Sequence, residues 1–139
     1  LPLSKKNFYL KKINPNASVW PTIFPTSCIS FKRNFFDNYL RFIKKNHFKN
    51  LEIDSRLIMY AHHYCDDFNI IDEKLTKYID DERGISSKYK KFSLNWWLKR
   101  DEAFQYLMFI LRKKNKNFIY SFDYYLTKTI NFLIRIFIR

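Results

Sequence analysis

The stretch from Ser93 to Lys113, SLNWWLKRDEAFQYLMFILRK, decides the fold class of this chain. Its apolar residues recur every three or four positions, which is the spacing of one face of an α-helix. These residues are Leu94, Trp97, Leu98, Phe104, Leu107, Met108 and Leu111. Arg112 and Lys113 stand at the end of the stretch, where cations interact favourably with the exposed carbonyl groups of a helix C-terminus. The stretch therefore predicts a long amphipathic helix.

Shorter segments before this stretch show the same spacing. From Phe35 onward the apolar positions are Phe36, Tyr39, Leu40 and Ile43, and from about 54 to 64 they are Leu57, Ile58, Ala61 and Tyr64. Asp54 or Ser55 can accept the first free amide hydrogens of the second of these helices. Asp72 can cap a third, short helix, which carries Leu75, Tyr78 and Ile79. The sequence thus predicts three helices ahead of the long one.

The C-terminal segment predicts a fifth helix, which Ser121 can cap. Phe122, Leu126, Ile130, Leu133 and Ile136 share one helical face, although the alternation from 132 to 139 also fits a strand; we favour the helix. Charged residues interrupt the segment at spacings that a bilayer centre would penalise. They are Asp123, Lys128, Arg135 and Arg139. We therefore expect no transmembrane span here, and expect the tail to be buried against protein or RNA.

The N-terminal third has neither helical nor strand periodicity. Residues 13 to 31 form an uncharged run, but Pro15, Pro21 and Pro25 make it a loop and not a membrane span. We expect residues 1 to 33 to form an extended basic arm and residues 34 to 139 to form one small helical domain. The predicted fold class is mainly α.

Charge is the most informative property of the composition. Twenty-six Lys and Arg against 13 Asp and Glu give a net charge of +13 over 139 residues. Such an excess repels itself unless a polyanion neutralises it. Residues 1 to 50 carry a net charge of +9 and residues 103 to 139 one of +6, while the nearly neutral middle of the chain, residues 51 to 102, carries −2. We expect a permanent anionic partner.

The sequence offers no credible catalytic or metal site, and we expect no cofactor and no small-molecule substrate. Gly84 is the only glycine, which excludes the glycine-rich loops that cradle phosphates. His62, His63 and Cys65 are the only cluster of ligand-type side chains, and the two histidines diverge by about 100 degrees on a helix. Runs of carboxylates such as 80 to 82 fit caps and solvated faces, and two cysteines fit reduced thiols.

Five clusters of basic residues are the candidate RNA-binding residues, because each can neutralise phosphates and release counterions. They are Lys5, Lys6, Lys11 and Lys12; Lys32 and Arg33; Arg41, Lys44, Lys45 and Lys49; Lys88, Lys90 and Lys91; and Arg112, Lys113, Lys114 and Lys116. Tyr9, Trp20, Phe31 and Tyr89 stand beside them as possible stacking surfaces for unpaired bases.

The composition resembles that of organelle-encoded ribosomal proteins, in particular those of ciliate-type mitochondria. Fifteen Phe and 10 Tyr against one Gly follow the codon bias of A/T-rich genomes. The stretch from Phe92 to Leu111 resembles the strand-and-helix stretch of the fifth large-subunit protein family. The motif SLNWWL, residues 93 to 98, followed by two helices resembles the C-terminal half of the seventh small-subunit family, and glycines expected in both families are absent. The resemblance implies a structural protein of the mitochondrial matrix whose partners are ribosomal RNA and neighbouring ribosomal proteins.

Another class of function stays open. An accessory subunit of a mitochondrial respiratory complex or ATP synthase would share the codon bias, and its apolar tail would pack on membrane-embedded partners. A third possibility, a small nucleic-acid enzyme such as a nuclease, would need a catalytic site, and the sequence offers no credible one. We expect a protein that is not an enzyme.

Overall fold

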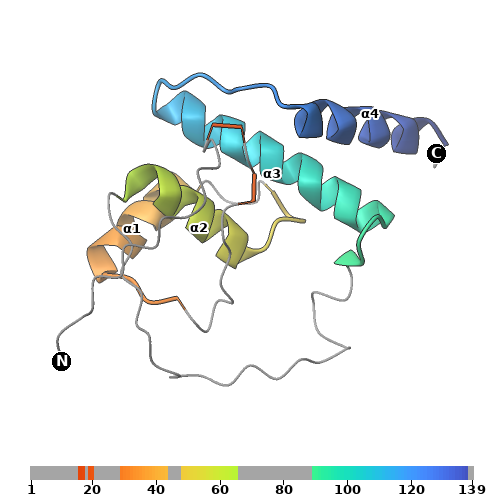
Figure 1. The fold of residues 1–139 in the computed structure, drawn as a ribbon. Helices are drawn as coiled ribbons and strands as arrows, with labels where there is room; N and C mark the ends of the chain where they lie inside the picture. Colours follow the sequence, from red (N-terminus) through yellow and green to blue (C-terminus); the bar gives the residue numbers. More distant parts are fainter. Residues whose placement is uncertain (1–15, 18, 21–28, 44–47, 66–88, 138–139) are drawn as a thin grey trace, which may run out of the picture.

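The computed structural model describes residues 16–17, 19–20, 29–43, 48–65 and 89–137 (Figure 1). Its helices are α1 (Arg33–Phe42), α2 (Ile53–Tyr64), α3 (Leu94–Lys113) and α4 (Phe122–Phe137), and no strand occurs in these ranges. The predicted mainly α fold is confirmed. The short helix expected after Asp72 and most of the expected N-terminal arm lie outside the described residues.

Helix α3 begins and ends where the sequence predicts. Ser93 is the N-cap, and its hydroxyl oxygen accepts a hydrogen bond of 3.3 Å from the amide of Trp96. At the other end the amide of Lys116 donates to the carbonyl of Leu111 at 2.9 Å, and that of Asn115 donates to Arg112 at 3.2 Å. With Asn115 at a φ of 53°, these bonds form a Schellman motif, which satisfies the last carbonyls of the helix.

Helices α1 and α2 start slightly earlier than their sequence patterns suggest. Helix α1 begins at Arg33 instead of Phe35, and α2 begins at Ile53. The N-cap of α2 is Glu52, which makes no side-chain cap hydrogen bond, so the predicted cap at Asp54 or Ser55 is wrong. Asp54 lies inside the first turn, where its carboxylate accepts a hydrogen bond of 2.7 Å from the amide of Ser55. The two helices lie together on one side of α3 (Figure 1).

The core forms between α2 and α3 and continues toward α1. The larger buried cluster consists of Val19, Leu51, Met59, Ala103, Phe104, Tyr106, Leu107, Ile110 and Leu111. A smaller one, Tyr39, Leu57 and Tyr60, joins α1 to α2. Removing a fully buried ring such as Phe104 from such a core costs about 3–5 kcal/mol. Most of the predicted stripe of α3 is therefore core.

Val19 shows that residues near the N-terminus complete this core. It is fully buried, and Trp20 packs against the same cluster. The carbonyl of Asn16 accepts a hydrogen bond of 3.1 Å from the amide of Ile119, and that of Ala17 accepts one of 3.4 Å from the Ser121 hydroxyl. Within the range expected to be an arm, these four residues lie on the helical body.

Helix α4 folds back along α3, as the contacts between Phe104 and Tyr124 at one end and Trp97 and Asn131 at the other show (Figure 1). The predicted helix is confirmed, and the strand alternative is wrong through Phe137. Ser121 caps the helix as expected, accepting a hydrogen bond of 3.2 Å from the amide of Tyr124.

The face of α4 that meets α3 is largely polar, with the ring of Tyr124 against Phe104 as its aromatic contact. Its buried residues are Thr127 and Asn131, whereas Phe122, Leu126, Leu133 and Ile136 of the predicted apolar face are exposed. Helix α3 explains this orientation, because it presents the charged side chains of Arg100 and Asp101 toward α4. Within the described ranges, no helix combines the length and the apolarity that crossing a membrane requires.

Candidate RNA-binding surface

Helix α1 carries three of the predicted cations. Lys32 at its N-cap, Arg33 in its first turn and Arg41 in its last turn are all exposed. Arg33 and Arg41 are eight residues apart and share a face with the exposed Asp37 between them, at the spacing that permits pairing along a helix. The net charge of this stripe is therefore +1, and Lys32 raises the charge of the helix start.

The C-terminus of α3 carries a denser cluster. Arg112, Lys113 and Lys116 are exposed, whereas Lys114 is partly buried. Lys114 donates a hydrogen bond from Nζ to the carbonyl of His63, in the last turn of α2, and lies 4.7 Å from the ring centre of Tyr64. One predicted RNA-binding cation thus also stabilises the negative end of another helix.

An aromatic cluster brings the C-terminal ends of α1, α2 and α3 together. The ring of Phe42 lies 5.4 Å from that of Tyr64 and 5.0 Å from that of Phe109. Lys113 Nζ lies 6.0 Å from the ring centre of Phe109. The structure therefore places the last turn of α1, which holds Arg41, beside the cationic end of α3.

Lys90 and Lys91 lie at the opposite end of α3. Both are exposed, and Lys91 Nζ lies 5.2 Å from the ring centre of Phe92. A helix of 20 residues is about 30 Å long, so these lysines form a separate site from that of Arg112. Lys49 is exposed in the turn before α2. The remaining predicted cations, Lys5, Lys6, Lys11, Lys12, Lys44, Lys45 and Lys88, lie outside the described residues.

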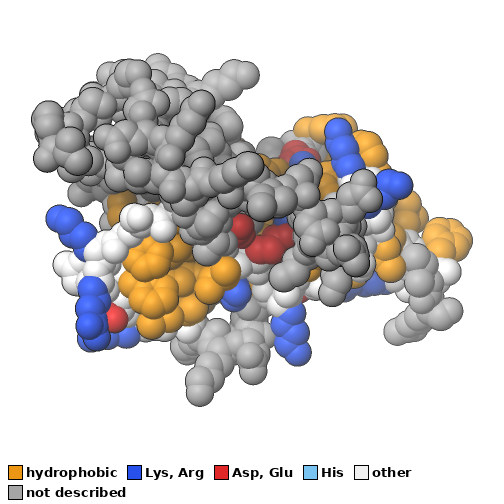
Figure 2. Space-filling view, turned by 90° about the horizontal axis from the view of Figure 1, so that it is seen from below, with side chains coloured by type: hydrophobic (Ala, Val, Ile, Leu, Met, Phe, Trp, Pro, Cys, Tyr) orange, Lys and Arg blue, Asp and Glu red, His pale blue; other side chains and the backbone are white. Residues whose placement is uncertain are grey.

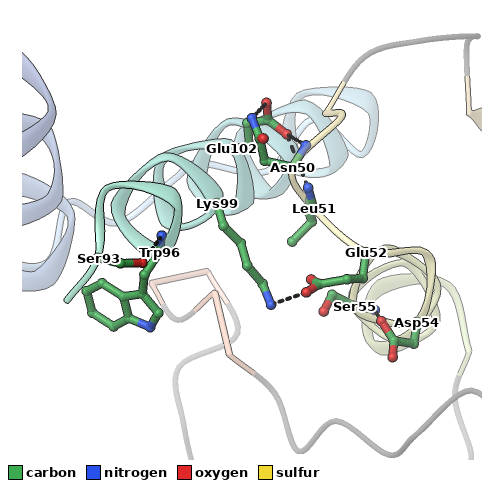
Figure 3. A network of polar contacts seen from close by, with 9 residues as sticks. All are labelled: Asn50, Leu51, Glu52, Asp54, Ser55, Ser93, Trp96, Lys99 and Glu102. Atoms are coloured by element: carbon green, nitrogen blue, oxygen red, sulfur yellow. Dashed lines mark hydrogen bonds and ion pairs between the residues drawn. The ribbon is translucent and has the colours of Figure 1, made fainter. Parts of the chain in front are cut away.

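The acidic side chains of the body are mostly engaged inside it (Figure 3). Glu102 accepts hydrogen bonds from the amides of Asn50 at 2.7 Å and Leu51 at 3.2 Å, and from the side chain of Asn50 at 2.7 Å. Glu52 pairs with Lys99 at 2.5 Å. These contacts hold the start of α2 against α3 and remove two negative charges from the surface.

The hairpin of α3 and α4 uses its acids in the same way. Asp101 pairs with Lys128 at 2.5 Å, and Asp123 pairs with Arg100. Arg100 also donates from Nε to the Thr127 hydroxyl at 3.2 Å. Among the acids of the described ranges, Asp37 is exposed on α1, and the side chain of Asp123 is 40% exposed although it pairs with Arg100. The exposed cations therefore keep most of their charge uncompensated.

The predicted stacking residues differ in their accessibility. Phe31 is exposed and its ring stacks on that of Phe36 at 4.9 Å. Trp20 and Tyr89 already lie beneath Lys99, whose Nζ is 5.7 and 4.8 Å from their ring centres. Tyr9 lies outside the described part of the chain.

Tyr64 is a candidate stacking residue that the sequence did not single out. The residue is 36% exposed, but its ring already stacks on that of Tyr60 at 4.3 Å and lies 4.7 Å from Lys114 Nζ, so a base has to displace one of these groups to stack on it. The helical pattern placed it in the apolar stripe of α2. What makes it a candidate is its position beside the cationic end of α3, which only the tertiary structure reveals.

His63 is buried at the end of α2, and its imidazole is held neutral. Burial lowers the pKa of His63 from 6.5 to about 4, and the nearby cations Lys116 and Lys114 act in the same direction, as does His62. No group of three metal-ligating side chains occurs within the described ranges. Asp66 and Asp67, which follow His62 and His63 by four residues each, lie outside them.

A view of the molecule from below shows how these groups are distributed (Figure 2). Lys and Arg side chains stand mainly toward the edges of this face, beside a hydrophobic patch on the side where α1 lies, and acidic side chains are visible near its centre. Comparison of the chain with protein families, with curated proteins and with solved structures gives no match. The candidate surface is therefore defined by its own chemistry alone.

Proposed function

We propose that this chain is a structural component of the mitochondrial ribosome and that it binds ribosomal RNA through its basic clusters. The surface around the C-terminal ends of α1 and α3 is the main contact, with Arg41, Arg112 and Lys113 facing phosphates. Neighbouring ribosomal proteins cover part of the rest. In this proposal the protein has no catalytic role and works in the mitochondrial matrix.

One observation carries the proposal: the body pairs its acids internally and leaves its cations exposed. Glu52, Asp101 and Asp123 each meet a cation from another element. Arg112, Lys113 and Lys116 have no carboxylate among the ion pairs of the described residues. A chain of net charge +13 arranged in this way is suited to a partner of dense negative charge.

Salt dependence of RNA binding tests this surface. The double variant Arg112→Glu with Lys113→Glu is expected to bind transcribed mitochondrial ribosomal RNA more weakly and with a shallower dependence on salt. The log–log slope should fall by about 0.9 for each phosphate that the variant no longer neutralises. Arg135→Glu, a charge reversal at an exposed position on α4, is the control. Equal slopes for the α3 variant and the unchanged protein would remove this surface from the proposal.

A second candidate function is an accessory subunit of a respiratory complex or ATP synthase. The exposed apolar face of α4 favours it, because such a face suits a partner in or beside a membrane. Co-sedimentation with ribosomal particles in sucrose containing high magnesium is expected under the first proposal. Co-migration with a respiratory complex in detergent would support the second and contradict the first.

A further inference from the structure

The outward side of α4 is a continuous apolar surface. Its members recur at helical spacing over the whole length of the helix, so they form one stripe opposite the polar face that meets α3. They are Phe122, Tyr125, Leu126, Phe132, Leu133, Ile136 and Phe137, all of them exposed. A stripe of seven large apolar side chains on a single outer helix is too extensive to be ordinary surface variation.

The helix is held in this orientation by specific contacts. Asn131 is buried and donates from Nδ2 to the carbonyls of Trp97 at 3.0 Å and Thr127 at 2.9 Å. Lys128 and Asp123 pair with α3 from the two sides of the same interface. Turning α4 to bury its apolar stripe would break all of its contacts with α3. The apolar face is therefore presented outward by the fold itself.

Charge indicates which kind of partner the stripe accepts. Arg135 is exposed on α4, and both acids of the hairpin interface, Asp101 and Asp123, are neutralised by cations. The surroundings of the stripe thus combine apolar and positive character. A second copy of this chain would bring another charge of +13 to the same place, and RNA offers single unpaired bases to aromatic rings but no continuous aliphatic surface to match the stripe.

We propose that α4 lies in the surface of an anionic phospholipid bilayer, with its apolar stripe among the upper acyl chains. A helix with one apolar and aromatic face, too polar on its other face to span, binds membranes in this way, and basic residues add attraction to anionic headgroups. Arg135 is placed to reach the headgroups, and Tyr125 has the ring and hydroxyl that suit the interface. The proposal goes beyond ribosomal RNA binding and does not depend on it.

Flotation of the full chain with vesicles tests the proposal. The vesicles contain equal parts phosphatidylcholine and phosphatidylglycerol. The double variant Phe132→Ser with Leu133→Ser is expected to partition onto them about tenfold more weakly, or more weakly still, because it lacks two side chains that insert into the membrane. The matched control is Phe31→Ser with Leu40→Ser. The residues are 64% and 44% exposed in the first pair and 43% and 47% in the second, so neither change removes core.

The control separates insertion from simple attraction of a basic protein to an anionic surface. The control variant and Arg112→Glu with Lys113→Glu are expected to retain most of the apolar contribution, which persists in high salt and on vesicles of phosphatidylcholine alone. Equal partitioning of the α4 variant and the unchanged protein would overturn the proposal. So would self-association through the same two residues without vesicle binding, which would assign the stripe to a second copy.

Circular dichroism checks that the double variant Phe132→Ser with Leu133→Ser keeps its helices, and its ribosomal RNA binding is expected to be unchanged. Loss of RNA binding by the α3 variant together with retained flotation would support both proposals. Flotation of a protein that does not bind RNA would overturn only the proposed function.

Discussion

Asn115 determines the direction in which the chain leaves α3. Its φ of 53° is costly for most residues and is tolerated by asparagine and especially by glycine. Since the Schellman bonds hold Lys116 against the end of the helix, this single residue also sets the position of the last cation of the cluster. A side chain that disfavours a positive φ should disturb both stability and the cationic surface.

Substitutions of Asn115 should raise or lower the free energy of unfolding according to how easily the new residue adopts a positive φ. Asn115→Gly is expected to raise the free energy of unfolding by roughly 0.5 kcal/mol, and Asn115→Val to lower it by about 1–2 kcal/mol. Urea unfolding followed by circular dichroism measures both. If glycine proved as destabilising as valine, the side chain of Asn115 and not its backbone would be the important feature.

His63 makes stability depend on pH. Its pKa in the folded chain is about 4, against 6.5 when unfolded, so between these values the unfolded chain binds a proton that the folded chain does not. The free energy of unfolding should therefore fall as the pH drops from 6.5 toward 4, by at most roughly 3 kcal/mol. Thermal unfolding of His63→Gln should show a weaker dependence across this window, and an unchanged slope would contradict the assignment.

At the scale of elements, α4 shows what periodicity can and cannot predict. The spacing of Phe122, Leu126 and Leu133 correctly gave a helix and correctly placed these residues on one face. The spacing could not predict which face of α4 contacts α3. That orientation depends on Arg100 and Asp101 of α3, which need polar partners. An apolar face in the sequence does not indicate which neighbour covers it. The ends of α3, in contrast, depend on local signals and were predictable.

The polar hairpin interface should unfold separately from the core. Asp101→Asn removes the charge that pairs with Lys128 and is expected to destabilise α4 by about 1–2 kcal/mol. Hydrogen exchange should then quicken for amides of α4 while those from Phe104 to Leu111 stay protected. Equal loss of protection in both helices would show that the hairpin opens together with the core.

On the scale of the whole molecule, the surplus of positive charge opposes compaction. Lys99, Arg100, Lys114 and Lys128 form internal polar contacts and Lys113 lies against a ring, whereas cations such as Arg33 and Arg112 face outward. The sequence predicted the surplus of positive charge and the clusters of basic residues. It did not predict which of these basic residues also form contacts inside the folded body. Lys114 and His63 are 51 positions apart in the chain, and they meet only because α2 and α3 end side by side.

Neutralisation by a polyanion should therefore stabilise the fold. Polyphosphate is expected to raise the melting temperature by several degrees at an ionic strength where sodium chloride has a smaller effect, because a chain of phosphates binds the folded surface as well as screening it. Differential scanning fluorimetry compares the two at matched ionic strength. Equal increases in melting temperature with polyphosphate and with sodium chloride would show that screening of charge alone stabilises the protein.

The bonds of Asn16 and Ala17 to the segment before α4 set the order in which the protein can be completed during synthesis. The Ser121 hydroxyl and the Ala17 carbonyl are 104 positions apart, so Ala17 can form this contact only after Ser121 has been synthesised. Val19 cannot take its place in the core until Phe104 and Leu107 have been made. Contacts between residues far apart in the sequence slow folding. They also leave Val19 and Trp20 exposed on the nascent chain, where a chaperone can bind them.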